Sequence, residues 1–319
     1  MPDTISEPAK LAYRALLDFV ERRIATQAPA LPGPDDQTGW REAQNRFASL
    51  TAQVFGTLPD GRFASSEAVL DGVPAIDIKP ALPLAADAVI VYLHGGGYVF
   101  GSARLSLPDA VSMAELTGYR TLSIDYTLAP HAKWQQITDE VARALHALQS
   151  EGYAARRIAL CGDSAGGSLA AGAVLKMRDQ GYALPGAVVL RSPWSDIAEI
   201  GDTYETLQDA DPMLCYRRDL AAAALAYART SDHRHPYVSP VYGDYSKGFP
   251  PTLIQGGTRD IFVSNCVRHF QALESCGVPA KLDLYEGMPH VFQKTCAGTP
   301  EADLAMRKLR DFLRTHIPA

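Results

Sequence analysis

One short stretch decides the fold of this chain, Cys161-Gly162-Asp163-Ser164-Ala165-Gly166-Gly167. An apolar run, Ile158-Ala159-Leu160, precedes it, and the helix-like run from Ser168 to Leu175 follows it. The pattern Gly-x-Ser-x-Gly predicts that Ser164 lies at a sharp strand-to-helix turn, where a side chain at either flanking glycine would collide with neighbouring backbone. Such a turn presents a hydroxyl at a helix N-terminus, where backbone N–H groups favour developing negative charge. On its own, the pattern also fits a plain glycine-rich turn.

Three further segments carry polar residues directly after apolar, strand-like runs. They are the loop His94-Gly95-Gly96-Gly97 after residues 89–93, Asp260 after residues 252–257, and His290 after residues 282–287. The order glycine-rich loop, serine, aspartate, histidine is that of an α/β-hydrolase triad. The carboxyl ends of strands are also where open α/β sheets place their sites. We therefore predict a site that combines these four segments.

The composition and charge of the chain argue against several classes of partner. It has 319 residues, of which 47% are hydrophobic, a net charge of −6 and a pI of about 5.8. This acidic balance gives no reason to expect nucleic acid or an anionic membrane as a partner. No apolar run approaches the roughly 20 residues that span a bilayer. The first residues lack the basic and apolar regions of a signal peptide.

The five cysteines are odd in number, scattered along the chain and without the spacing of metal ligands. Free thiols in a reducing compartment are therefore expected, and we predict a cytoplasmic location. The sequence predicts neither a metal site nor a cofactor.

Alternating strand and helix patterns predict an α/β fold with a mostly parallel sheet. Two amphipathic helices are expected first, over residues 8–28 and 36–53, followed by a β-hairpin over 62–79 with its turn at Asp71-Gly72. The expected strands then cover residues 88–93, 120–125, 157–161, 187–190, 252–255 and 281–285. The expected helices cover residues 105–117, 138–149, 166–180, 263–276 and 300–315, with Gly118 suited to a C-cap.

The alternation lapses between residues 192 and 246, which predicts an insertion above the sheet with a helix-like segment at 219–228. We therefore divide the chain into four parts. Residues 1–55 form N-terminal helices that contribute to a cap, residues 56–191 the first part of the hydrolase core, 192–246 the cap insertion, and 247–319 the second part of the core.

A serine hydroxyl needs a base to take its proton, and the base needs an orienting partner. We predict Ser164 as the nucleophile and His290 as the base, because an imidazole titrates near neutrality. Asp260 is the predicted orienting acid. Asp283, inside a strand, and Glu286, close to the histidine in sequence, remain alternatives.

An oxyanion requires preorganised N–H donors. The glycines after His94 can turn their N–H groups inward, and the N–H of Ala165 points the same way. His94 precedes the nucleophile in the chain, so we expect it to support the glycine loop together with Gly95. Asp163 is expected to be structural.

The combined motifs resemble the hormone-sensitive-lipase-like family of α/β-hydrolase carboxylesterases. The matching segments are His94-Gly95-Gly96-Gly97-Tyr98, Asp125-Tyr126-Thr127-Leu128-Ala129-Pro130, Gly162-Asp163-Ser164-Ala165-Gly166-Gly167, Ser192-Pro193-Trp194 and Gly287-Met288-Pro289-His290-Val291-Phe292. The resemblance implies an eight-stranded sheet, a helical cap, hydrolysis of short- to medium-chain acyl esters, and oxyanion donors at Gly96, Gly97 and Ala165. Members of the family are often dimers, which implies a possible homodimer.

The chain departs from the family pattern in two segments. Asp260-Ile261-Phe262 stands where the family often has Asp-Pro-Leu, so the choice of acid rests on its position. Thr127 and His131 stand where the family usually has Arg and Glu. Both exchanges lie near the expected mouth of the site.

We therefore predict a serine carboxylesterase that acts through an acyl-enzyme on a small-molecule ester. A lactone hydrolase with the same triad is the close alternative. A non-catalytic binding protein, like the plant gibberellin receptors that resemble this family but lack the histidine, is disfavoured by the presence of His290. A peptidase or amidase is disfavoured by the family resemblance. The candidate pocket residues, which equally fit plain packing of the cap, are Tyr98, Trp194, Met213, Leu214 and Tyr216.

Overall fold

The computed structural model describes residues 2–25, 30–55 and 63–318. Eight strands form one sheet in the order β1-β2-β4-β3-β5-β6-β7-β8. Their bounds are β1 Phe63–Leu70, β2 Val73–Pro80, β3 Val89–Leu93, β4 Arg120–Ile124, β5 Ile158–Asp163, β6 Ala187–Arg191, β7 Thr252–Gly257 and β8 Ala280–Tyr285. β1 pairs antiparallel with β2 and β2 with β4, while all other neighbours are parallel. The predicted eight-stranded, mostly parallel sheet is confirmed.

The opening hairpin has the turn that its sequence predicts. Leu70 pairs with Val73, and the two residues between them, Asp71 and Gly72, have φ angles of 45° and 78°. Positive φ at both central positions is the geometry of a type I′ turn, whose twist matches that of the two strands.

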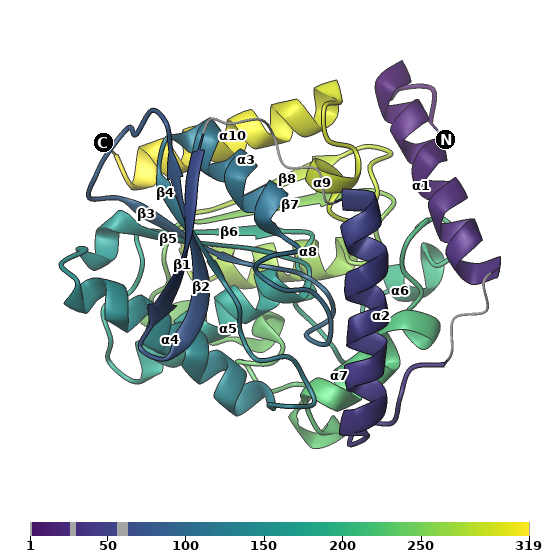
Figure 1. Ribbon diagram of the computed structural model, residues 1–319, viewed down its shortest axis with the longest axis horizontal. Coiled ribbons are helices and arrows are strands. Elements are labelled where there is room, and N and C mark those ends of the chain that lie inside the picture. The colour runs from purple at the N-terminus through teal and green to yellow at the C-terminus, as the bar shows by residue number, and fades with distance from the viewer. Residues whose placement is uncertain (1, 26–29, 56–62, 319) are drawn as a thin grey trace.

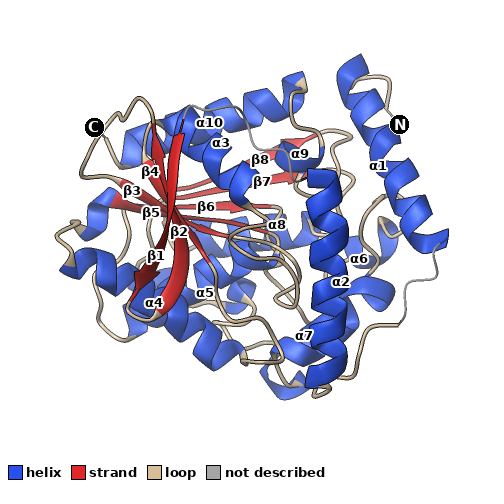
Figure 2. Ribbon diagram, in the orientation of Figure 1, coloured by secondary structure: helices blue, strands red, loops and turns tan. Residues whose placement is uncertain are grey.

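Helices cover both faces of the sheet (Figures 1 and 2). Side chains of α3 Leu107–Thr117 and α10 Pro300–His316 pack on one face, and those of α4 Trp134–Ser150, α5 Ala165–Asp179 and α8 Val263–Glu274 pack on the other. Alternate residues of β3 divide between the two faces: Val89 and Val91 belong to one core, and Ile90 and Tyr92 to the other. A strand buried on both faces is therefore apolar throughout, as residues 89–93 are.

The helix predicted at 138–149 begins four residues earlier, at Trp134. Trp134, Ile137, Val141 and Leu148 are all buried in the same core, so the apolar spacing of the helix extends back to the tryptophan. The C-cap predicted at Gly118 is confirmed, since its backbone is left-handed with φ 76°.

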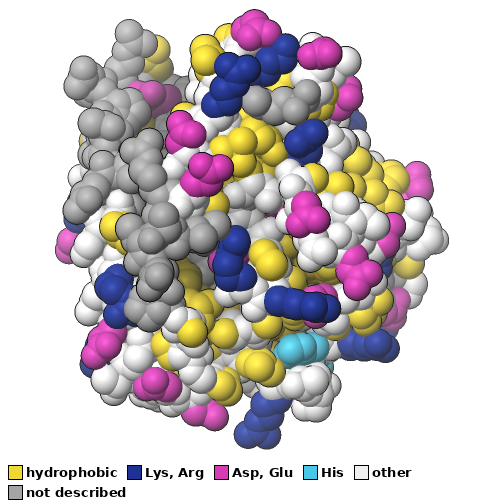
Figure 3. Space-filling model, turned by 90° about the vertical axis from the view of Figure 1, so that its right-hand side faces the viewer, with side chains coloured by type: hydrophobic (Ala, Val, Ile, Leu, Met, Phe, Trp, Pro, Cys, Tyr) yellow, Lys and Arg dark blue, Asp and Glu magenta, His cyan; other side chains and the backbone are white. Residues whose placement is uncertain are grey.

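Two groups of helices lie outside the layers that flank the sheet. The N-terminal helices are α1 Glu7–Ala25 and α2 Gln37–Phe55, and the segment between β6 and β7 contains α6 Thr203–Thr206, a π-helical turn over Tyr216–Leu220 and α7 Ala221–Tyr227. A further short helix, α9, spans Phe292–Thr295. α1, α2, α6 and α7 gather at the right-hand end of the molecule in Figure 1. On that face, hydrophobic side chains lie in patches among charged ones (Figure 3).

Parts of three predicted segments fall outside the described residues. They are the end of the first helix at 26–28, the start of the hairpin at 62, and the boundary between the N-terminal helices and the core at 56. Within the described part of the chain, no helix has the length and apolar character needed to cross a membrane.

Candidate active site

The turn that carries Ser164, the predicted nucleophile, joins β5 to α5 and is called the nucleophile turn below. Ser164 has φ 54° and ψ −122°. A Cβ atom on Gly162 would lie 2.3 Å from the carbonyl oxygen of Gly166, and one on Gly166 would lie 2.2 Å from the carbonyl oxygen of Leu93. Real side chains do not approach backbone this closely, so both positions require glycine. The crowding on both sides is the steric reason expected for the Gly-x-Ser-x-Gly pattern.

Backbone hydrogen bonds hold the turn against the loop after β6. The N–H of Ser164 donates to the carbonyl of Arg191 at 2.9 Å, and its carbonyl accepts from the N–H of Trp194 at 3.0 Å. The hydroxyl of Ser192 in the same loop accepts from the N–H of Val291 at 3.0 Å. The loop after β6 therefore links the serine to the segment that carries His290.

Beneath the turn lies a buried ion pair. The Arg191 guanidinium donates to both carboxylate oxygens of Asp163, at 2.5 and 2.8 Å. The Tyr92 hydroxyl donates to the same carboxylate at 2.5 Å. Asp163 and Arg191 are 3% and 2% exposed, so water does not compete for these bonds. The contacts support the structural role expected for Asp163.

His290 and Asp260 meet at the ends of β8 and β7. The distance from His290 Nδ1 to Asp260 Oδ2 is 2.9 Å, and Asp260 Oδ1 accepts from the N–H of Phe262 at 2.9 Å. The Phe262 ring packs edge-on against the imidazole, with 5.1 Å between ring centroids. With Nδ1–H donated to the carboxylate, Nε2 is the nitrogen left to act as a base.

Burial by itself would lower the pKa of His290, but the Asp260 carboxylate, with smaller effects from Asp211 and Asp163, raises it above its usual value of 6.5. The acidic neighbours therefore make this imidazole a stronger base than a free one.

The two alternative acids, Asp283 and Glu286, do not contact His290 in the hydrogen bonds described for them. Asp283 binds the Lys308 ammonium at 2.5 Å and the Tyr285 hydroxyl at 2.8 Å, and Glu286 is exposed.

The glycine loop packs directly on the nucleophile turn. A Cβ on Gly95 would lie 3.2 Å from Cβ of Ser164. Gly96 has φ 120°, and its carbonyl accepts from the N–H groups of Val99 and Phe100. Within the residues that the structure describes, the N–H groups of Gly96, Gly97 and Ala165 have no protein acceptor. They are therefore free to donate to a developing oxyanion.

His94 lies behind this loop with no exposed surface. Its ring stacks on Tyr126 with 4.3 Å between centroids, and the Tyr126 hydroxyl donates to the His94 carbonyl at 2.8 Å. Burial lowers the pKa of His94 to about 4, so the ring is neutral at physiological pH. These contacts support the expected role of His94 in holding the loop.

The candidate pocket residues divide into two groups. Tyr98 and Trp194 have no exposed surface: Tyr98 stacks on Tyr227 with 3.6 Å between centroids, and Trp194 stacks on Phe262. The Tyr216 ring is also buried, and its hydroxyl donates to the carbonyl of Ile197 at 2.8 Å. In this structure these three aromatic rings pack behind the site. Met213 and Leu214 are only half-buried.

Four non-glycine residues near the site have left-handed backbone. They are Tyr98 with φ 67°, Ser164 with φ 54°, Ser192 with φ 46° and Val291 with φ 46°. A β-branched residue such as Val291 rarely adopts this conformation. Each of the four adjoins or belongs to a segment predicted for the site, so backbone strain is concentrated there.

Two residues of the site region were missed at the sequence level. Asp211 accepts the N–H of Ile261, the neighbour of Asp260, at 3.0 Å, although fifty residues separate them. Phe100, three residues after Gly97, stacks on Phe47 of α2 with 4.8 Å between centroids. Its nearness to the glycine motif is the sequence signal that could have pointed to Phe100.

A surface groove lies away from the proposed site. A groove of about 500 Å³ runs along the free edge of β8 and is lined by residues including Leu282, Lys308 and Phe312. It lies beside the edge strand and not at Ser164, which is itself 8% exposed. Among the described residues, no group of three or more His, Cys, Asp and Glu side chains is arranged to hold a metal ion.

Comparison with known proteins identifies the family. A family described as having the alpha/beta hydrolase fold matches residues 90–294. The match begins in β3 and includes the nucleophile turn, Asp260 and His290. The chain belongs to this family.

An acetyl-hydrolase of Streptomyces hygroscopicus is 33% identical over 226 residues, which are 71% of this chain and 75% of the relative. The putative acetyl-hydrolase LipR of Mycobacterium tuberculosis is 34% identical over 249 residues, or 77% of this chain and 79% of that protein. The crystal structure of an esterase from the bacterial hormone-sensitive lipase family aligns with a TM-score of 0.86 at 30% identity, over 99% of this chain and 100% of the esterase. These likenesses confirm the resemblance to hormone-sensitive-lipase-like esterases and the predicted class, a carboxylic ester hydrolase.

Proposed function

We propose that this protein is a serine carboxylesterase that hydrolyses short- to medium-chain acyl esters through an acyl-enzyme. The observation that carries the proposal is the 2.9 Å hydrogen bond between His290 Nδ1 and Asp260, at the same end of the sheet as the strained turn of Ser164. The bond orients an imidazole whose basicity its acidic neighbours increase. These features supply a base and a serine nucleophile at the same end of the sheet.

In the acylation step, the Ser164 hydroxyl attacks the ester carbonyl while its proton passes to Nε2 of His290. The carbonyl oxygen takes up the negative charge, and the N–H groups of Gly96, Gly97 and Ala165 stabilise it. Each such donor contributes about 3–4 kcal/mol to transition-state stabilisation. His290 then gives its proton to the departing alkoxide, so the alcohol leaves and the acyl group stays on Ser164.

In the deacylation step, His290 takes a proton from water, and the resulting hydroxide attacks the acyl carbonyl. The same N–H donors stabilise the second oxyanion. The C–O bond to Ser164 breaks, the proton on His290 returns to the serine oxygen, and the carboxylic acid leaves. Asp260 keeps its charge throughout and stabilises the imidazolium form of His290.

We propose that α1, α2 and the segment between β6 and β7 form the cap. The contact of Phe47 in α2 with Phe100 and the hydrogen bond from Gln44 to the carbonyl of Ala129 at 3.2 Å support this assignment. Both contacts join α2 to loops beside the glycine motif. The half-buried Met213 and Leu214 are the residues that we assign to the acyl pocket. The relatives called acetyl-hydrolases support a preference for short acyl chains.

Hydrolysis of p-nitrophenyl esters from acetate to palmitate, together with one ε-lactone, tests the proposal. Turnover should be greatest on short acyl chains and should be lost in Ser164→Ala, while the circular dichroism spectrum of the variant stays that of the wild type. Activity retained by Ser164→Ala would refute the mechanism. Preference for the lactone would identify a lactone hydrolase, and no turnover by folded protein would favour a binding role.

We also propose a cytoplasmic homodimer. The family resemblance and the scattered cysteines support it. Light scattering of the purified protein tests the dimer, and fractionation of cells that express the untagged chain tests the location. A monomeric mass, or recovery from outside the cytoplasm, would contradict the corresponding part.

A further inference from the structure

A second buried carboxylate, Asp211, binds the backbone next to the catalytic acid. It lies between β6 and β7 and is 7% exposed. Asp211 Oδ1 accepts from the N–H groups of Met213 at 2.8 Å and Leu214 at 3.0 Å, and Oδ2 accepts from the N–H of Ile261 at 3.0 Å. Both oxygens therefore have backbone donors, and one of those donors belongs to the neighbour of Asp260.

The turn that follows β7 is held by two carboxylates. Asp211 accepts the N–H of Ile261, and Asp260 accepts the next one, that of Phe262, at 2.9 Å. The carbonyl of Asp260 accepts from the N–H of Val263 at 3.0 Å. The N–H of Ile261 is therefore bound from the insertion, whereas those of Phe262 and Val263 are bound within the turn by Asp260 itself. Displacement of the turn would break its bond to Asp211.

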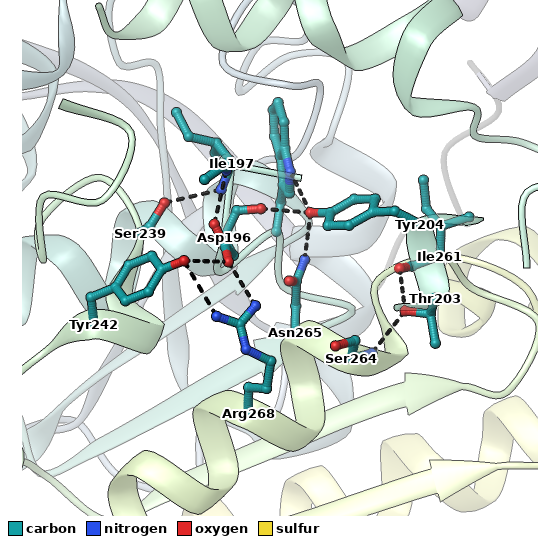
Figure 4. A network of polar contacts seen from close by, with 12 residues as sticks. Asp196, Ile197, Thr203, Tyr204, Ser239, Tyr242, Ile261, Ser264, Asn265 and Arg268 are labelled. Carbon is teal, nitrogen blue, oxygen red and sulfur yellow. Dashed lines mark hydrogen bonds and ion pairs between the residues drawn. The ribbon is translucent and has the colours of Figure 1, made fainter. Parts of the chain in front are cut away.

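The hydroxyl of Thr203, in the same insertion, forms a second set of hydrogen bonds to this turn. Thr203 Oγ1 donates to the carbonyl of Ile261 at 2.7 Å and accepts from the N–H of Ser264 at 3.0 Å. Figure 4 shows this bridge beside a larger network in which Tyr204 and Asn265 join the insertion to α8. The insertion is thus anchored to the Asp260 turn at Ile261 and to the start of α8 at Ser264.

We propose that Asp211 is a positioning residue for the catalytic acid: it fixes the Asp260 turn from the insertion, and its negative charge favours the imidazolium that His290 becomes during the reaction. This inference rests on the triad proposed above. It assigns to the insertion a part in the chemical step beyond covering the substrate.

The charges around Asp211 agree with this role. Burial and then the neighbouring Asp260 carboxylate raise the pKa of Asp211 to about 7, against smaller lowering by His290 and its backbone donors. Above about that pH the Asp211 carboxylate is ionised and helps to raise the pKa of His290. Among the described residues, further titratable groups that interact with Asp211 or His290 include Asp163, Arg218 and Tyr13. Tyr13 also contacts Arg259.

Asp211→Asn tests the proposal, with Asp209→Asn as the matched control. Both variants remove one negative charge from the same segment, but Asp209 is exposed. For Asp211→Asn we expect kcat with p-nitrophenyl acetate to fall about tenfold or more, because the Asp260 turn loses its bond to Asp211 and loosens. We also expect the acidic limb of kcat/KM to move to lower pH, since His290 loses a charge that raises its pKa. Asp209→Asn should change neither quantity.

If the acidic limb of the pH profile of kcat/KM for Asp211→Asn coincides with that of the wild type, the proposed effect of the Asp211 charge on His290 is overturned, even if kcat falls. Thr203→Val separates the two parts of the proposal. It removes the second anchor and keeps the charge, so kcat should fall while the acidic limb stays in place. A shifted limb in Thr203→Val would also contradict the assignment of the charge effect to Asp211.

NMR titration of the His290 imidazole distinguishes a failure of this inference from a failure of the proposed function, because it needs no turnover. In the Ser164→Ala background, addition of Asp211→Asn should lower the measured pKa of His290. An unchanged pKa would overturn the inference. If Asp211→Asn does not fold, the wild-type protein is titrated with pH while NMR follows the side-chain carboxyl carbon of Asp211 and the His290 imidazole. Titration of Asp211 should then perturb the His290 signals. If the two groups titrate independently, the coupling is refuted.

Discussion

Replacing Gly166 by alanine should separate the nucleophile turn from the glycine loop. The added Cβ would lie 2.2 Å from the carbonyl oxygen of Leu93 and 2.4 Å from that of His94. Both are backbone atoms at the end of β3, so no flexible side chain can move aside. Contacts of a real Cβ essentially never fall under 3.0 Å. The two segments must therefore part by at least 0.8 Å to accept the methyl group.

This displacement lies where the reaction needs its geometry. The segment that must move leads directly into Gly96 and Gly97, whose N–H groups are the proposed oxyanion donors. A misplacement of about 1 Å between reacting groups lowers a rate by about 100-fold. Forcing a methyl group into a packed site also costs about 1–3 kcal/mol of stability. We therefore expect kcat to fall about 100-fold with a moderate loss of folding free energy.

The assay compares kcat for p-nitrophenyl acetate with urea unfolding followed by circular dichroism. Gly33→Ala is the matched control, because a Cβ there would have nothing within 4 Å, and it should leave both quantities close to wild type. If folded Gly166→Ala keeps kcat within about threefold of wild type, a loss too small for a displaced oxyanion donor, the reasoning from the crowded turn is wrong.

Three further outcomes follow from the site. Arg191→Met leaves the Asp163 carboxylate buried without its cation, so urea unfolding should show that the free energy of unfolding falls by about 3–5 kcal/mol. Arg310→Met, which breaks the surface pair with Asp311, should lower it by less than about 1 kcal/mol. Equal losses in the two variants would contradict the argument from the buried pair. Asp260→Asn should lower kcat by about 10⁴-fold by favouring the wrong histidine tautomer, and a near-normal rate would exclude Asp260 as the acid. Because the base must be neutral, kcat/KM should decline toward acid through a pKa above 6.5, the usual value for His290; a profile that stays flat to pH 6 would argue against this base.

The fold was predictable because its signals are local. The strand at 89–93 is apolar throughout since both faces are buried, and the turn at Asp71-Gly72 requires two positive φ angles that this pair adopts readily. The order of the candidate triad was predictable for a similar reason. Ser164, Asp260 and His290 each come shortly after an apolar strand-like run, so the topology of a parallel sheet brings them to the carboxyl ends of its strands.

The contacts of the insertion were not predictable in this way. Asp211 meets Ile261, and Thr203 meets both Ile261 and Ser264, across stretches of chain that carry no periodic pattern. The aromatic residues posed a different problem. A tryptophan such as Trp194 has the same character whether it lines a pocket or packs behind one, and only the three-dimensional arrangement distinguishes the two.

The left-handed backbone of Tyr98, Ser164, Ser192 and Val291 has a consequence for directed evolution. Each conformation costs about 1–3 kcal/mol, so substitutions that relax these positions, such as glycine at Val291, would be enriched in a library selected for heat resistance alone. The same substitutions would loosen the segments that carry the proposed nucleophile and the proposed base. Thermostable variants that keep their catalytic rate should therefore be sought at the helices and the hairpin, with these four positions held constant.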